Sequence, residues 1–109
     1  MHELSITQSV VDTVCERAAG RTVHKVTVEV GALIAVVPEA MLFCFDVVAA
    51  GTVAAGAALE IERRPAVVHC RDCGGDFEPP DLILLCPCGS ADVVVTAGLQ
   101  LQIRSMEVG

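Results

Sequence analysis

The chain has 109 residues, of which 53% are apolar and only 3% aromatic, and its formal net charge is −7. This length suits one domain, or one domain with a small module, and the composition predicts an aliphatic core. The negative charge argues against binding to nucleic-acid phosphates. The longest uncharged run, residues 47–59, is too short for a membrane-spanning helix, which needs roughly 20 residues. We therefore expect no nucleic-acid partner and no membrane segment.

The six cysteines and the first residues of the chain indicate the cellular compartment of the protein. The chain opens with His and Glu rather than with a basic region and an apolar stretch, so no secretory signal is expected. In a reducing cytosol, paired cysteines bind metal more often than they form disulfides. We therefore predict a cytoplasmic, metal-binding protein.

The first predicted element is a helix over residues 4–19, because apolar residues recur there at helical spacing. Gly20 follows in the position of a C-cap glycine. The expected inward stripe is Leu4, Val11, Val14 and Ala18. Residues 23–30 then alternate valine with polar residues, which is typical of a half-buried strand.

A second helix is predicted from Pro38 to about residue 50, because proline suits the first turn of a helix. Its expected inward residues are Met41, Leu42, Phe45 and Val48. Residues 59–63 alternate again and predict a second strand. The same alternation resumes after Gly98 and predicts a third.

Together these elements predict an α+β fold: two helices packed on a three-stranded sheet, with a zinc-ribbon-like module inserted before the last strand. The module is assigned to residues 66–94, where cysteines, Gly-Gly and Pro-Pro replace the periodic patterns. The remaining residues, 1–65 and 95–109, would form the α+β domain.

Four cysteines in this module have the spacing of a metal site. Cys70 and Cys73 form one pair, Cys86 and Cys88 the other, and a glycine follows each pair. Two such knuckles suit a tetrahedral, structural Zn(II) site, which leaves no position open for a substrate. His69, next to the first pair, is an alternative zinc ligand, although a plain strand residue is the simpler interpretation.

Two other functions compete for the same cysteines. A thiol oxidoreductase would use Cys70 and Cys73 as a redox pair, although no βαβ pattern surrounds them. A zinc-ribbon adaptor would bind protein or nucleic acid, although acids outnumber bases in residues 66–94. Cys15 and Cys44 lie in the predicted helices and are expected to be small core residues.

The N-terminus allows two interpretations. His2 is either a solvated residue or part of a nitrogen-rich chelate with the Met1 amine and the backbone amides. An amine and an imidazole ordinarily titrate near about pH 8 and 6.5, so both can bind metal at cytosolic pH. Square-planar nitrogen ligation is favoured by Ni(II) and Cu(II). Glu3 alone indicates an acid suited to a helix N-terminus.

At this point the sequence resembles a known family. The opening Met-His-Glu-Leu-Ser-Ile is similar to that of the HypA/HybF hydrogenase maturation factors. The resemblance continues through Val-Glu-Val-Gly at 28–31, Phe-Cys-Phe-Asp at 43–46, both cysteine knuckles, and residues 101–107. It therefore covers essentially the whole chain.

The resemblance implies a nickel metallochaperone rather than an enzyme. Such a protein delivers Ni(II) for maturation of [NiFe]-hydrogenase, and in some organisms of urease. Its implied partners are a HypB-type GTPase and the hydrogenase large subunit; monomer and dimer both stay open. The implied nickel site is His2 with the Met1 amine and the Glu3 backbone. The implied structural Zn(II) ligands are Cys70, Cys73, Cys86 and Cys88, the last pair being one residue closer than in many relatives.

Overall fold

The computed structural model describes residues 2–109, apart from the side chains of His2 and Leu82. The chain forms two compact units. Unit 1 comprises the residues up to 29 together with 35–62 and 102–109, and unit 2 comprises residues 30–34 and 63–101. None of the helices within the described residues has the length and apolar character needed to cross a bilayer.

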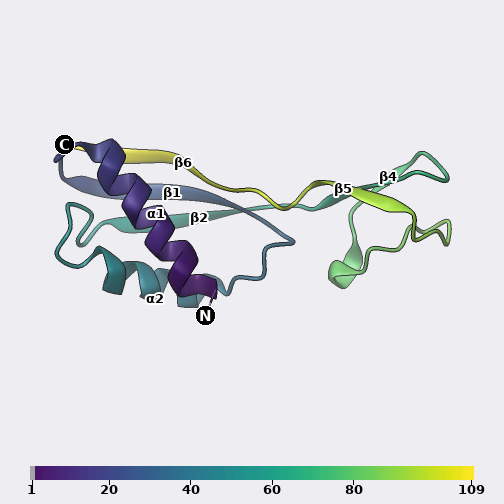
Figure 1. The fold of residues 1–109 in the computed structure, drawn as a ribbon, viewed down its shortest axis with the longest axis horizontal. Helices are drawn as coiled ribbons and strands as arrows, with labels where there is room; N and C mark the ends of the chain where they lie inside the picture. The colour runs from purple at the N-terminus through teal and green to yellow at the C-terminus, as the bar shows by residue number, and fades with distance from the viewer. Residues whose placement is uncertain (1) are drawn as a thin grey trace. The chain divides into compact units, whose positions relative to one another are not determined.

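The helices and main sheet follow the predicted order. They are α1 (His2–Ala18), β1 (Val23–Gly31), α2 (Pro38–Ala49), β2 (Ala58–Arg64) and β6 (Leu101–Val108). The three strands form one sheet in the order β2-β1-β6, and α1 crosses in front of it while α2 runs alongside (Figure 1). The α+β fold with two helices on a three-stranded sheet is confirmed.

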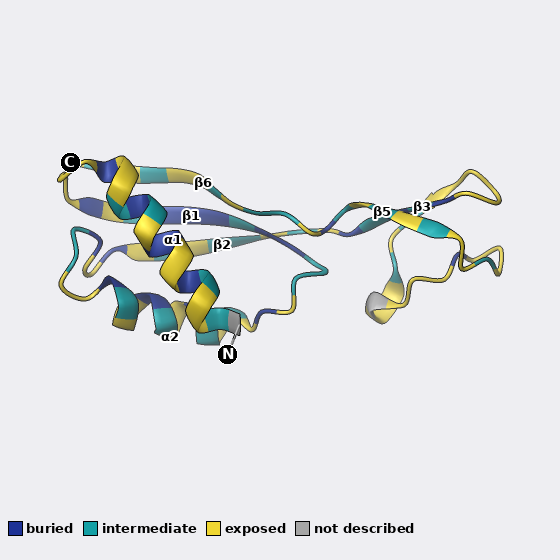
Figure 2. Ribbon diagram, viewed as in Figure 1, coloured by how far each residue is buried: buried dark blue, intermediate teal, exposed yellow. Residues whose placement is uncertain are grey.

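The core of unit 1 is aliphatic, as the composition predicts. The β1 valines at positions 26 and 28 are fully buried, and Val30, which is fully buried too, belongs to unit 2. Val11, Val14 and Ala18 of α1 are buried with them, and so are Met41 and Phe45 of α2. In Figure 2, buried segments recur along α1, and most of β1 is coloured as buried.

Two residues expected in the core lie on the surface instead. Leu4 is 53% exposed, and Thr7, one turn further along α1, is fully buried. Thr7 can occupy this position because its hydroxyl donates a hydrogen bond to the Glu3 carbonyl within the helix. On α2, Leu42 is 41% exposed and Ala49 is buried. The inward face of α2 is therefore rotated from the predicted one.

Unit 2 contains a second small sheet that the sequence did not predict. It consists of β3 (Val67–Cys70), β4 (Asp76–Phe77) and β5 (Val93–Ala97), with the short 3-10 helix η1 (Pro80–Leu82) between β4 and β5. Both β4 and β5 pair antiparallel with β3, which lies in the centre. Such short strands carry too little periodicity to be recognised before their pairing is known.

The two units do not have the predicted bounds. Unit 2 is wider than residues 66–94, because it includes residues 63–65, 95–101 and the end of β1. The assignment of nickel binding to one domain and zinc binding to the other stays a prediction.

The end of β1 and the two residues after it are hydrogen-bonded to other segments of unit 2. The N–H groups of Gly31, Ala32 and Leu33 donate hydrogen bonds of 2.8–2.9 Å to the carbonyls of Gln100, Arg64 and Gly98, respectively. A Cβ on Gly31 would lie only 2.2 Å from the backbone carbonyl group of Gly98. This junction therefore requires glycine at position 31.

Candidate metal centre

The four predicted cysteines come together in unit 2. Their sulfur atoms all lie within 4.8 Å of one another, and within the described residues this is the one group of three or more potential metal ligands. The Cys70 and Cys88 sulfurs are 3.7 Å apart, and those of Cys73 and Cys86 are 3.6 Å apart. Each close pair takes one sulfur from each knuckle.

These distances fit a tetrahedral zinc site. Four sulfurs bonded at about 2.3 Å to one tetrahedral ion lie about 3.8 Å from each other. The observed separations are close to this value without any disulfide, since all four thiols are free. The donor set therefore fits Zn(II), and such an ion would hold the two knuckles together.

Each knuckle is a tight turn closed by two backbone hydrogen bonds. In the first, Cys70 N–H donates to the Gly75 carbonyl and Gly74 N–H donates to the Cys70 carbonyl. In the second, Cys86 N–H donates to the Ser90 carbonyl and Gly89 N–H donates to the Cys86 carbonyl. Each bond in the second knuckle spans one residue fewer. The shorter Cys-Pro-Cys spacing is thus absorbed by a tighter turn, and the sulfurs still converge.

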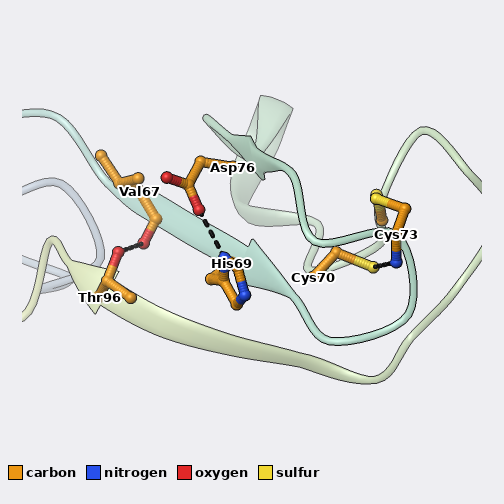
Figure 3. A network of polar contacts seen from close by, with 7 residues as sticks. Val67, His69, Cys70, Cys73, Asp76 and Thr96 are labelled. Atoms are coloured by element: carbon orange, nitrogen blue, oxygen red, sulfur yellow. Dashed lines mark hydrogen bonds and ion pairs between the residues drawn. The ribbon is translucent and has the colours of Figure 1, made fainter.

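Glycine is needed after each knuckle because the backbone there is left-handed. Gly74 and Gly89 have φ angles of 75° and 97°, a region that residues with a Cβ rarely adopt. The backbone N–H groups of Cys73 and Cys88 point at the sulfurs of Cys70 and Cys86, each at 3.5 Å. Figure 3 shows the first of these contacts.

The first cysteines of the two knuckles differ in acidity. The backbone N–H of Cys73 favours the Cys70 thiolate and lowers the pKa of Cys70 to about 7. The Cys88 N–H favours the Cys86 thiolate too, but loss of hydration and neighbouring sulfurs outweigh it and raise the pKa of Cys86 to about 12. At neutral pH, metal binding must therefore displace a proton from Cys86.

His69 lies on β3 but not within the sulfur cluster. Its Nδ1 donates a 2.7 Å hydrogen bond to the Asp76 carboxylate of β4 (Figure 3). The potential metal-ligand group consists of the four cysteines alone. Ligation by His69 stays a prediction, and the observed contact gives the ring a structural partner.

Polar side chains join the two knuckles outside the cluster. The Ser90 hydroxyl, just after the second knuckle, donates to the Asp72 carboxylate in the first. Arg71 forms a 3.2 Å ion pair with Asp92, and its N–H donates to the Asp92 carbonyl. No local sequence pattern indicates these links, because the partners are about 20 residues apart in the chain.

The N-terminal candidates lie at the start of α1. The helix begins at His2, whereas Met1 and the His2 side chain lie outside the described residues. The Glu3 carboxylate accepts a 3.0 Å hydrogen bond from the Val37 N–H, just before α2. This bond, followed by one from its own backbone N–H, lowers the pKa of the Glu3 carboxyl. From the sequence alone Glu3 is an acid suited to a helix N-terminus, and nothing local indicates Val37, 34 residues away, as its partner.

The two remaining cysteines take no part in the cluster. Cys15 of α1 and Cys44 of α2 are half-buried and carry free thiols. The sequence predicts small core residues at both positions, and the structure places both only partly in the core.

Comparison with known proteins places the chain in one family. The sequence profile described as "Hydrogenase/urease nickel incorporation, metallochaperone, hypA" matches residues 1–108. The hydrogenase maturation factor HypA of Geobacter sulfurreducens is 46% identical, with 99% of each chain covered. That of Nostoc sp. is 42% identical, covering 99% of this chain and 96% of the relative.

Solved structures agree with the sequence comparison. The solution structure of the Ni metallochaperone HypA from Helicobacter pylori matches with a TM-score of 0.68 at 25% identity, covering 97% of this chain and 96% of that one. A second solution structure of a HypA protein gives a TM-score of 0.71 at 26% identity, with 99% and 96% covered. On these grounds, and with its four-cysteine cluster in a zinc-ribbon-like module, the chain belongs to the HypA family of hydrogenase maturation metallochaperones.

Proposed function

We propose that this protein binds Ni(II) at its N-terminus and delivers it for maturation of [NiFe]-hydrogenase, and in a suitable host of urease, while a structural zinc ion holds unit 2 together. The observation that carries the proposal is the family match along residues 1–108, which begins at the Met-His-Glu opening. The convergent thiols of unit 2 support a separate zinc site.

The start of α1 suits a nickel chelate. The first N–H groups of a helix are not needed for its own backbone hydrogen bonds, so nickel binding at the backbone nitrogens of residues 2 and 3 would leave those bonds intact. The Glu3 N–H would exchange its contact with the Glu3 carboxylate for the metal. The His2 imidazole and the Met1 amine would complete a nitrogen-rich set of the kind that Ni(II) prefers. The Glu3 carboxylate already accepts the Val37 N–H, so we assign its backbone rather than its side chain to nickel.

Zinc would be held by Cys70, Cys73, Cys86 and Cys88. Such an ion supplies folding free energy and no open coordination position. The chain's residues build the two turns that hold the thiols, and Ser90 and Asp72 join those turns.

The partners we propose are a HypB-type GTPase and the hydrogenase large subunit, with delivery taking place in the cytoplasm. We expect no nucleic-acid partner, because the one base of residues 66–94, Arg71, is paired with Asp92. The oligomeric state, monomer or dimer, is left to measurement.

The proposal is tested by metal analysis of tag-free protein, wild type beside His2→Ala. Both should retain one zinc ion, and only the wild type should bind nickel in a titration. Nickel binding by the wild type should weaken between about pH 7.5 and 5.5, because protons compete for the imidazole and the amine. Equal nickel binding by both proteins would move the site away from His2.

A matched control adds residues ahead of Met1. The extension removes the free amine and leaves the four cysteines untouched, so nickel affinity should fall while zinc content stays constant. Full nickel affinity in the extended protein would show that the amine is not a ligand.

A further inference from the structure

Helix α2 is apolar on both of its faces. Its inner face buries Met41, Phe45 and Ala49. Its outer face exposes Leu42, Phe43 and Val47, to 41%, 69% and 57% respectively. Large apolar side chains that gather on an exposed face are characteristic of interaction sites. The outer face of α2 therefore has the composition of a surface that another molecule covers.

The exposed residues form one continuous strip. Glu39, Leu42, Phe43, Asp46 and Val47, which we name the outer strip, follow one another at intervals of three, one, three and one residues, the spacing of a single helix face. Apolar side chains alternate along it with two carboxylates. Exposed apolar side chains interspersed with charged groups of one sign suit an interface with a partner of the opposite charge.

The negative charge of α2 indicates which kind of molecule could bind to the outer strip. α2 contains two acids and no base, and no cation follows in its last turn to balance the negative end of the helix dipole. A second copy of the chain would place acids near acids, and an anionic membrane would repel the strip. A surface that combines apolar side chains with Lys or Arg complements it.

The strip also reaches the start of α1. Val37, which directly precedes α2, is 54% exposed, and its N–H donates to the Glu3 carboxylate. A molecule on the strip would thus sit beside the residues that carry nickel, a consequence that rests on the proposed function. The strip itself does not depend on nickel.

We propose that the outer strip of α2 is a docking surface for a protein that presents an apolar helix or groove flanked by basic residues. Apolar contact with Phe43 and Val47 supplies affinity, and the Glu39 and Asp46 carboxylates orient the partner. The partner lies along the length of α2, and the end of the strip at Glu39 is the end nearest to the start of α1.

A synthetic probe tests this surface directly. The probe is an amphipathic peptide of about 14 residues built from Leu and Lys, and its control replaces every Lys by Glu. Zinc-loaded, nickel-free protein should bind the Lys peptide with NMR shifts confined to α2 and the start of α1, and it should not bind the Glu peptide. Because no nickel is present, this outcome is independent of the nickel site.

Three variants locate the binding. Phe43→Asp should weaken binding of the Lys peptide about tenfold or more, and Asp46→Lys should weaken it and reduce its salt dependence. Ile83→Asp changes a residue of unit 2 that is also 57% exposed and should have no effect. Circular dichroism and zinc content check folding, and Asp46→Lys, which leaves the apolar residues intact, keeps the test valid if Phe43→Asp misfolds.

Three results would overturn the proposal. The first is equal binding of the Lys and Glu peptides. The second is an equal loss of affinity in Phe43→Asp and Ile83→Asp. The third is a wild-type dimer in sedimentation that Phe43→Asp disperses, which would make the occupant a second copy of the chain.

Discussion

Glu3 joins the two helices of unit 1 at the point where both begin. Its carboxylate accepts the Val37 N–H, a donor that has no partner within α2 because it precedes the first helical turn. The side chain therefore fixes the first turn of α1 against the start of α2. A change at this residue should affect the local structure even before any nickel is bound.

We predict that Glu3→Ala accelerates hydrogen exchange of the Val37 amide and that Glu3→Gln, whose amide oxygen can accept the same bond, preserves much of its protection. Glu39→Gln, an exposed acid in the first turn of α2, is the matched control and should leave the Val37 amide unchanged. Two-dimensional NMR measures all three. Unchanged exchange in Glu3→Ala would show that the contact contributes nothing in solution.

The same bond has a defined pH dependence. Because the folded-state pKa of Glu3 is lowered from its ordinary value of 4.5, its contribution to stability is fully present above pH 4.5 and is lost as the pH falls through the lower folded value. Glu3→Gln removes the titrating group, so its unfolding free energy should depend less steeply on pH in this acid range.

At the scale of elements, the end of β1 belongs to unit 2 rather than to the unit that contains the rest of the strand. Three consecutive N–H groups at residues 31–33 donate to the segments that enter and leave unit 2. The close approach of Gly31 to Gly98 leaves no room for a side chain.

We predict that Gly31→Ala lowers the free energy of unfolding by about 1–3 kcal/mol, since the added methyl meets backbone atoms that cannot move aside freely. The amides of Gly31 and Leu33 should lose exchange protection. Gly20→Ala introduces a methyl where no atom lies within 4 Å, although φ there is +85°, and it should leave the amides of residues 31 and 33 protected. Wild-type protection in Gly31→Ala would contradict the prediction.

At the scale of the whole molecule, the two units differ in what stabilises them. Unit 1 buries side chains from α1, α2 and β1. Among the described side chains of residues 63–101, by contrast, only those of Val68 and Cys70 are fully buried. A segment with so little buried apolar surface does not fold on hydrophobic burial alone. The four thiols are the groups through which a metal would add the missing stability.

We therefore predict that a zinc chelator, or Cys86→Ser, abolishes exchange protection in β3 and β5 while the amides of α1 and β1 up to residue 29 remain protected. Cys44→Ser, which changes a thiol outside the cluster, should leave both units protected. Exchange measured before and after metal removal distinguishes the outcomes. Joint loss of protection in both units would show that unit 1 depends on the metal too.

The sequence by itself determined the order and nature of the main elements, the four clustered cysteines and the family. Helix and strand periodicities are local properties of the sequence, and the spacing of the two cysteine pairs is itself the pattern of a metal site. For this reason α1, β1, α2 and β2 begin or end within about two residues of their predicted bounds.

Only the tertiary structure decided that Ala49 rather than Leu42 joins Met41 and Phe45 in the buried face of α2, since apolar residues on both faces leave the edges of that face undefined by periodicity. It also decided the pairing of β3 with β4 and β5, the hydrogen bonds that join the end of β1 to other segments of unit 2, and the contact between Glu3 and Val37. The pairings and the Glu3–Val37 contact join residues that are distant in sequence and meet only after the chain has folded. The buried face of α2 is selected by its packing against the rest of unit 1.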